Sequence, residues 1–426
     1  MSFTRTLFGP QPRRTVQTVF TPRSKDVNTE MYVERPELEK ALHRSVTSHM
    51  HTFLFGESGN GKSWLYKHVL KKSNISYVSI NCGNVSRLKS ITNEILNACF
   101  SVGHSEKISY EEEKEASVKA VVAEGRLQHT GKFNIHQDES LLRSFKAINE
   151  REDGRLSVIV IDNLEFIFDK PELLEELCSI ILLLDDERYG KYNIKFLIVG
   201  IPNGVLEFFS KISNIESVSN RISELPKVSG LGQNQVLEIV KRGFVEQLGI
   251  TLSPAEIGKI SKHIFDITLG VAQRVHEYCT HLGHKIEDSN WKFQPDSLEK
   301  ADQKWLIQGL RASYAVIESH MNSKETAVGR RNQVIFAIGQ TRSHQFSVSD
   351  VEDIIKREFP ETIPETNMGI GAILSELTKS DKPLVQKVGK ITAYSIKDPR
   401  YIMCIRLVLY KNKDGGRIEK KHFARS

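Results

Sequence analysis

The sequence predicts an α/β protein with a three-layer P-loop domain, a helical lid and a C-terminal winged helix-turn-helix domain. A glycine-rich loop at residues 56–63 separates a short apolar run from a helical pattern. Apolar strands alternate with helical stretches up to residue 228, as in a parallel sheet that helices cover on both faces. After residue 325, three helical patterns precede two β-like runs, which is the outline of a winged helix.

The expected elements follow the chain in that order. Strands are predicted at residues 52–55, 76–81, 156–161 and 195–200, and helices at 64–70, 86–100 and 173–184. Helices at 332–338, 349–359 and 369–379 come before strands at 390–396 and 401–409, with a turn at 397–400. The predicted organisation is a basic extended arm at 1–28, an α/β domain at 29–228 with an insertion at 101–138, a helical lid at 229–300 and a winged-helix domain at 301–426.

Composition limits the class of protein. No segment approaches the roughly 20 apolar residues that a membrane-spanning helix needs, so no membrane partner is expected. Arginines interrupt the N-terminal region, which therefore lacks the apolar core of a signal peptide. The five cysteines are scattered without a C-x-x-C pair, which argues against a disulfide framework or a zinc site. A cytoplasmic location is expected.

The charge is unevenly distributed. Residues 301–426 hold 21 Lys and Arg against 14 Asp and Glu, a net charge of +7, whereas the whole chain carries +6. A basic C-terminal third beside a neutral body indicates contact with a polyanion. The alternative is a solvated basic face that keeps the protein soluble.

The glycine-rich loop matches the phosphate-binding pattern G-x-x-x-x-G-K-[ST] at every position. Glycines let backbone N–H groups point at phosphate oxygens, and the following helix adds its positive end. Lys62 is expected to bridge the β- and γ-phosphates of ATP, and Ser63 to offer its hydroxyl to Mg²⁺. The expected nucleotide-binding residues are Gly56, Glu57, Ser58, Gly59, Asn60, Gly61, Lys62, Ser63 and Trp64.

Asp162 ends an apolar strand pattern. The carboxyl ends of parallel strands are where open α/β sheets bind ligands, so Asp162 is expected to hold Mg²⁺ together with Ser63. The alternative is a helix-capping role, because a helical stretch could begin near Leu164.

With these motifs, residues 30–290 resemble the AAA+ ATPases. The resemblance implies that Asp162 is the Walker B aspartate. The family places a catalytic Glu after that residue, whereas this chain has Asn163. Glu165 could substitute for it, and more distant candidates are Asp185, Asp186 and Glu187. This departure favours slow ATP hydrolysis, as in an ATP-dependent switch, rather than rapid turnover.

The same resemblance assigns five further residues. Asn203 corresponds to the sensor-1 polar residue, or is a turn Asn between Pro202 and Gly204. Arg221 corresponds to the arginine finger that one subunit presents to its neighbour's nucleotide, or is a surface Arg. Arg274 corresponds to sensor 2 in the lid. Tyr32 and Arg35 correspond to the segment that packs on the adenine.

A finger that acts in trans implies self-association through head-to-tail interfaces, which close into a ring or continue as a filament. The sequence does not choose between the two.

The predicted C-terminal domain brings duplex DNA into consideration. The recognition helix is expected at about 367–379, where an apolar start predicts little base-specific contact. Expected phosphate-neutralising residues are Arg330, Arg331, Arg342, Lys411, Lys413, Arg417, Lys420 and Lys421.

The whole arrangement resembles replication-initiator ATPases of the origin-recognition branch and archaeal-type ATPases of the STAND group. The first resemblance implies an ATP-dependent oligomeric switch that hydrolyses ATP slowly and binds DNA through the winged helix. The second implies a regulatory ATPase, for example in anti-phage defence, whose winged helix binds protein and which controls a separate effector.

Overall fold

A computed structural model describes residues 13–100, 139–183, 185–201, 215–322, 329–341, 345–365, 367–388, 393–412 and 416–421. The chain divides into two compact units. We call Glu34–Ser229 the sheet unit, and Met1–Val33 together with Gly230–Ser426 the helical unit.

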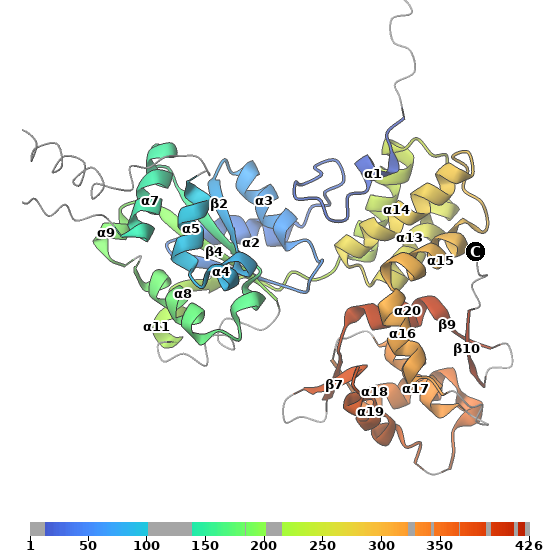
Figure 1. Cartoon of the computed structure of the whole chain (residues 1–426). Coiled ribbons are helices and arrows are strands. Elements are labelled where there is room, and N and C mark those ends of the chain that lie inside the picture. The colour runs from blue at the N-terminus through green and yellow to red at the C-terminus, as the bar shows by residue number, and fades with distance from the viewer. Residues whose placement is uncertain are drawn as a thin grey trace, which may run out of the picture. The chain divides into compact units, whose positions relative to one another are not determined.

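The sheet unit is built on parallel strands in the order β2-β3-β4-β1-β5 (Figure 1). Each neighbouring pair runs parallel, so the carboxyl ends of the strands meet at one edge. The strands are β1 His51–Phe55, β2 Ser76–Asn81, β3 Ser157–Asp162, β4 Ile194–Gly200 and β5 Ile222–Glu224.

Both faces of this sheet are buried. On β3, Val158 and Val160 pack on one side, and Ile159 and Ile161 pack on the other. The first face is covered by α2 Pro36–Val46 and α3 Lys62–Lys72. The second is covered by α4 Cys82–Leu88, α5 Ile91–Cys99, α7 Ser140–Arg151, η1 Leu164–Ile167, α8 Pro171–Leu183, α9 Glu187–Gly190 and α11 Ile215–Ser219. The predicted three-layer α/β domain is confirmed.

The predicted strands match β1 to β4 within one residue at each end. The prediction missed β5, which is too short to carry a pattern of its own. The single helix predicted at 86–100 is wrong, because Lys89 adopts a left-handed φ of 55° and separates α4 from α5. The Ser90 side chain then accepts a hydrogen bond from Asn93 N–H and begins α5. The insertion predicted at 101–138 lies outside the described residues.

The helical unit begins with a segment that differs from the extended arm expected at 1–28. Its described part contains α1 Val16–Val19, and Val16, Val19 and Phe20 are buried in the unit's core. The ring centroid of Phe20 lies 4.9 Å from that of Phe244. The partner elements are α12 Gln233–Val240, the π-helix η2 Lys241–Gln247, α13 Pro254–Thr268, α14 Ala272–Asp288, α15 Ser297–Gly309 and α16 Arg311–His320.

The C-terminal part of this unit contains the three predicted helices, here α17 Arg330–Gln340, α18 Val348–Glu358 and α19 Ile370–Lys379. A short helix η3 spans Pro360–Thr362. An antiparallel sheet in the order β6-β8-β7 joins β6 Gln345–Ser347, β7 Val385–Val388 and β8 Ala393–Ile396. The last elements are α20 Pro399–Val408 and the antiparallel pair β9 Leu409–Lys411 and β10 Ile418–Lys420.

The strand predicted at 401–409 is wrong, since α20 occupies almost all of it. Asp398 accepts a hydrogen bond from Arg400 N–H and Pro399 takes the first helical position, which are helix-start signals rather than turn signals. The apolar run that follows is buried throughout, so periodicity could not separate a core helix from a strand.

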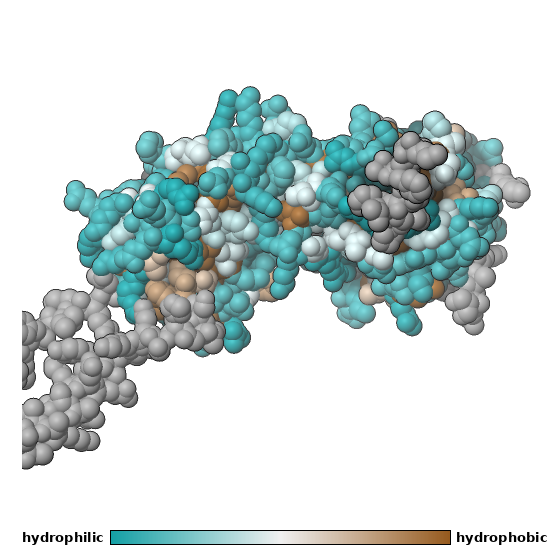
Figure 2. All heavy atoms as spheres, turned by 90° about the horizontal axis from the view of Figure 1, so that it is seen from above, coloured by the Kyte–Doolittle hydropathy of each residue, from teal (hydrophilic) through white to brown (hydrophobic). Residues whose placement is uncertain are grey.

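The described surface is mostly hydrophilic in the view of Figure 2, with hydrophobic residues in small separate areas. Among the described residues, no helix is both long and apolar enough to cross a membrane.

His51 begins β1 as a buried neutral imidazole. Its Nδ1 accepts a hydrogen bond from Phe196 N–H on β4 at 3.1 Å. Burial, with a smaller contribution from the charge of Lys195, lowers the pKa of His51 to about 4.

Stability should therefore depend on pH through this residue. Below pH 6.5 the unfolded chain binds a proton that the folded chain rejects, so stability is complete above that pH and falls as the pH drops towards 4. The full loss amounts to about 3 kcal/mol. The free energy of unfolding, measured with urea, should fall less steeply between pH 6.5 and 4.5 in His51→Gln than in the wild type. In the exposed variant His49→Gln it should fall as steeply as in the wild type. An equally steep fall of the unfolding free energy in the two variants would contradict the role of His51.

Candidate nucleotide site

The loop at residues 56–63 connects β1 to α3 and needs glycine at three positions. Gly59 and Gly61 have left-handed φ angles of 84° and 86°. At Gly56, an added Cβ would lie 2.4 Å from the carbonyl oxygen of Val228. Backbone geometry and close packing therefore explain why glycine occurs at these three positions.

The segment after β5 holds the loop in place. Asn60 Nδ2 donates to the carbonyl oxygen of Val228 at 3.1 Å, and the Lys227 ammonium lies 2.7 Å from Glu57 Oε1. Gly56 and Val228 also form a parallel β-bridge. Sequence analysis missed Lys227 and Val228, because no local pattern signals a contact between residues about 170 positions apart.

Lys62 lies inside the loop. Its ammonium donates to the carbonyl oxygens of Gly56 and Glu57 at 2.7 and 3.1 Å. Burial lowers the pKa of Lys62, and the charges of Glu165, Asp162 and Glu57 act in the opposite direction. The loop therefore encloses a cation that nearby carboxylates stabilise.

Asp162 ends β3 beside α3. Its Oδ2 accepts from the Ser63 hydroxyl at 3.3 Å and from the Tyr66 hydroxyl at 3.4 Å, and its Oδ1 accepts from Asn163 N–H at 2.8 Å. Burial raises the pKa of Tyr66, and the charge of Asp162 raises it further. Tyr66 was not predicted, although its position three residues after Ser63 places it on the same helix face.

Asn163 and Glu165 follow in a tight bend. Asn163 has a φ of 60°, a left-handed conformation that Asn adopts more readily than Glu. Glu165 lies in η1, and its Oε2 is buried without a hydrogen-bond partner among the described residues. The charges of Asp162 and Glu165 both add to the effect of burial in raising the pKa of Cys82. The bend therefore places a second carboxylate near Lys62.

Arg221 lies at the opposite edge of the sheet. It precedes β5, and Ile222 pairs with His51 at the start of β1. Its Nε donates to Asp185 Oδ2 at 2.6 Å, and its backbone oxygen accepts from His51 N–H at 2.7 Å. Arg221 is thus held by its own subunit, away from its own phosphate loop.

The contacts of the other predicted residues do not test their assigned roles. Arg35 donates to the carbonyl oxygen of Ser229 at 3.0 Å. Tyr32 belongs to the helical unit, where it is buried, and so does Arg274, which pairs with Glu277 Oε2 at 2.5 Å. Asn203 lies outside the described residues. Their assigned roles stay predictions.

The oxygen atoms at this edge fit a magnesium ion. Ser63 and Asp162 supply a hydroxyl and a carboxylate in contact with each other. Within the described ranges, no group of three or more His, Cys, Asp or Glu could hold a metal. Two protein oxygens suit Mg²⁺, which usually keeps waters and binds substrate phosphates.

Removal of the buried cation should weaken nucleotide binding. We expect Lys62→Ala to weaken ATP binding at least about tenfold, because a charge-assisted hydrogen bond to phosphate contributes about 1.5–3 kcal/mol. Isothermal titration calorimetry measures this, with the exposed Lys71→Ala at the end of α3 as the matched control. Wild-type affinity in Lys62→Ala would disprove the assignment.

Comparison with known proteins agrees with this geometry. The family described as AAA domain matches residues 45–209. The fold is similar to a Walker-type ATPase of Pyrococcus abyssi, with a TM-score of 0.51 and 16% identity over 91% of this chain and 99% of that chain. No curated protein matches the sequence.

Two further structures are similar with lower scores. The ORC2 protein of Aeropyrum pernix in its ADP form has a TM-score of 0.48 and 15% identity, over 91% of this chain and 96% of that one. Cdc6p from Pyrobaculum aerophilum has a TM-score of 0.42 and 15% identity, over 92% and 97%. At these identities the likeness concerns the fold alone. The family match, the phosphate loop and the five-stranded parallel sheet agree that the sheet unit has the fold of a P-loop AAA domain.

Proposed function

We propose that this protein is an ATP-dependent oligomeric switch that hydrolyses ATP slowly and binds duplex DNA through its C-terminal region. The observation that carries the proposal is the convergence of Lys62, Ser63, Asp162 and Glu165 at one edge of the sheet. A cation, a magnesium-binding pair and an unpartnered carboxylate are the groups that phosphoryl transfer to water requires.

In this proposal the loop binds the phosphates of ATP. Backbone N–H groups of residues 57–63 and the Lys62 ammonium neutralise the β- and γ-phosphate charge. Ser63 and Asp162 would hold Mg²⁺, which supplies further neutralisation of the transferring phosphoryl group. The hydrogen bonds that Tyr66 and Asn163 donate keep the Asp162 carboxylate oriented towards Ser63.

We assign water activation to Glu165. Its Oε2 is buried and makes no hydrogen bond among the described residues, so it is available to accept a proton from water. Asn163 fills the family's usual position, but its backbone turns in the left-handed region and its N–H is bonded to Asp162. Glu165 lies two residues after this position, on the short helix η1, and a base so placed is consistent with slow hydrolysis.

Arg221 supports an oligomer. Between the paired His51 and Ile222 and the end of β1 at Phe55, the sheet advances about 13 Å. This is longer than an arginine side chain, so Arg221 cannot reach its own phosphate loop. A role as a finger therefore requires a neighbouring subunit, in a ring or a filament. Asn203 and Arg274 remain the proposed sensors of the γ-phosphate.

The pairing of Arg221 with Asp185 supports the switch. An isolated subunit holds its finger on its own carboxylate, which is 58% exposed. Assembly must exchange this ion pair for contact with a neighbour's nucleotide. Such an exchange couples turnover to self-association, as expected of a signalling ATPase.

The C-terminal elements support the winged-helix assignment. Helices α17, α18 and α19 and the sheet β6-β8-β7 occur in the order helix, strand, helix, helix, strand, strand. Exposed cations lie at the end of α19, in the loop after it and on β7, at Lys379, Lys382 and Lys387 respectively. We propose that these lysines contact DNA phosphates.

The basic side chains that the sequence assigns to phosphate contact differ from these exposed lysines. Most of them are engaged within the chain: Arg330 with Thr362 O, Arg331 with Glu376, Lys411 with Glu358 O, Lys420 with Glu318 and Lys421 with Asp302. Arg417 has a contact of its own, and Arg342 and Lys413 lie outside the described residues. These side chains are therefore less available as phosphate contacts than a count of basic residues suggests.

The same observation favours a second candidate function. A C-terminal domain whose cations are largely paired internally suits binding to protein. The chain would then be a STAND-like regulatory ATPase that controls a separate effector. A measurement of binding to duplex DNA discriminates between the two candidate functions.

The first prediction concerns Glu165. Glu165→Gln keeps the side chain's size but removes the base, so kcat for ATP hydrolysis should fall about 100-fold or more while ATP affinity stays within about twofold. The matched control is the exposed Glu172→Gln on α8. Unchanged turnover in Glu165→Gln would exclude Glu165 as the base.

The second prediction concerns duplex DNA. Replacing Lys379, Lys382 and Lys387 together by Ala should reduce the slope of log affinity against log salt by about 3, since each phosphate contact contributes about 0.9. Fluorescence anisotropy with a labelled duplex measures the slope. The control replaces three exposed lysines outside this region, Lys241, Lys262 and Lys300. Absence of duplex binding by the wild type at low salt would reject DNA in favour of a protein partner.

A further inference from the structure

The helical unit contains a hollow of ≈ 490 Å³ that the ATPase account does not use. Two loops form it together with Arg13, which precedes α1 in the chain. One loop, residues 249–251, joins η2 to α13, and the other, residues 290–294, joins α14 to α15. This volume is within the range of small-ligand sites.

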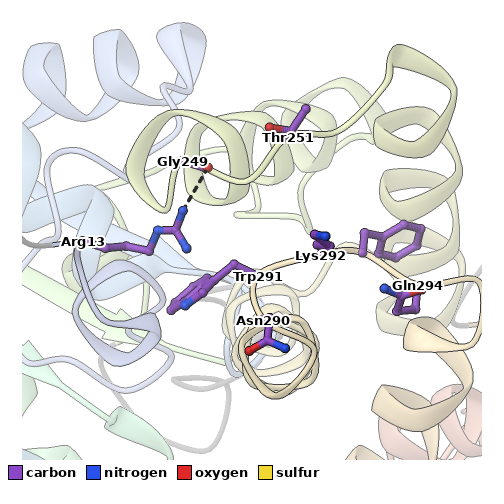
Figure 3. Close-up of a pocket in the computed structure, with 8 residues that line it drawn as sticks. Arg13, Gly249, Thr251, Asn290, Trp291, Lys292 and Gln294 are labelled. Carbon is purple, nitrogen blue, oxygen red and sulfur yellow. Dashed lines mark hydrogen bonds between the residues drawn. The ribbon is translucent and has the colours of Figure 1, made fainter.

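An aromatic platform lies at one end of the hollow. The Arg13 guanidinium stacks over the Trp291 ring, 4.4 Å from its centroid (Figure 3). Arg13 also donates to the carbonyl oxygen of Gly249 at 3.5 Å, which links the two loops. Trp291 packs partly against the core of the unit and remains half-buried. The platform is therefore fixed from below and accessible from the hollow.

The backbone of the platform is unusual. Asn290 and Trp291 have consecutive left-handed φ angles of 54° and 61°. Asn tolerates this region, whereas a bulky residue such as Trp rarely adopts it. The conformation is held by hydrogen bonds from Asn290 N–H to Glu287 O at 3.0 Å and from Trp291 N–H to Ile286 O at 2.8 Å. Glycine would make this turn without strain, so the indole is held in a backbone conformation that a bulky residue rarely adopts.

The charge of the hollow has one sign. Arg13 and Lys292 line it, and none of its described lining residues is acidic. Figure 3 shows Lys292 between the Trp291 platform and Gln294. A ligand of this hollow should therefore join a flat π-surface to a negative charge.

We propose that this hollow binds a nucleotide through its base and phosphate. The base stacks on the planar surface of Trp291 and Arg13, since bases stack on both indole rings and guanidinium groups. Lys292 and the free edge of Arg13 neutralise the phosphate. The nucleotide comes from single-stranded nucleic acid or from free nucleotide. The site is separate from the phosphate loop and independent of duplex binding by the C-terminal region.

The test uses the full chain with Lys62→Ala, so that nucleotide binding at the phosphate loop is weakened. The probe is a labelled twelve-nucleotide oligothymidylate, followed by fluorescence anisotropy. Trp291→Ala should weaken binding at least about fivefold, the effect of losing one base–aromatic stack. Trp291→Phe should recover most of the affinity because it keeps an aromatic face. The exposed Lys262→Ala on α13 should bind like the parent.

Competition identifies the source of the nucleotide. Thymidine monophosphate that displaces the probe supports a free-nucleotide site, whereas displacement only by unlabelled oligothymidylate supports single-stranded nucleic acid. A second variant, Lys292→Glu, changes an exposed side chain and should weaken binding even if Trp291→Ala fails to fold. Failure of the oligothymidylate probe to bind, or binding that neither Lys292→Glu nor Trp291→Ala weakens, overturns the proposal.

Discussion

Parallel pairing of the strands determines where each functional group of the sheet unit can act. β1 and β3 lie on either side of β4, with all three running in the same direction. The phosphate loop after β1 and Asp162 at the end of β3 therefore meet at one edge, within hydrogen-bond distance of each other through Ser63. The same pairing places Arg221, which precedes β5, at the other edge. The geometry that brings the phosphate loop to Asp162 thus separates both from Arg221 of the same chain.

The phosphate edge is also balanced electrostatically. Lys62 is buried, and burial alone would favour its neutral form. The carboxylates of Glu165, Asp162 and Glu57 oppose that effect and stabilise the ammonium that phosphate binding needs. Glu57 is itself held by Lys227, in the segment that packs on Gly56. The loop, the carboxylates and residues 227–228 consequently form one connected network of contacts.

Local patterns explain what the sequence could predict. The phosphate loop and Asp162 were identified because each belongs to a short motif beside an apolar strand, and four strands followed from apolar runs of the right length. Contacts between distant segments, such as Asn60 with Val228, have no such signal. The helix α20 was mistaken for a strand because its apolar run is buried on all sides and so lacks the amphipathic period. A count of charges at residues 301–426 likewise does not tell which lysines and arginines are paired within the chain, since composition carries no information on contacts.

The central claim is that one subunit's Arg221 completes its neighbour's phosphate site. Mixing two inactive proteins tests it most directly. Glu165→Gln lacks the proposed base and Arg221→Ala lacks the finger, so each alone should hydrolyse ATP at a small fraction of the wild-type rate. In a mixed oligomer, some interfaces combine an intact Glu165 with an intact Arg221, and activity should rise well above the sum of the two. A mixture no more active than its components, or an Arg221→Ala protein with wild-type turnover, would contradict the account.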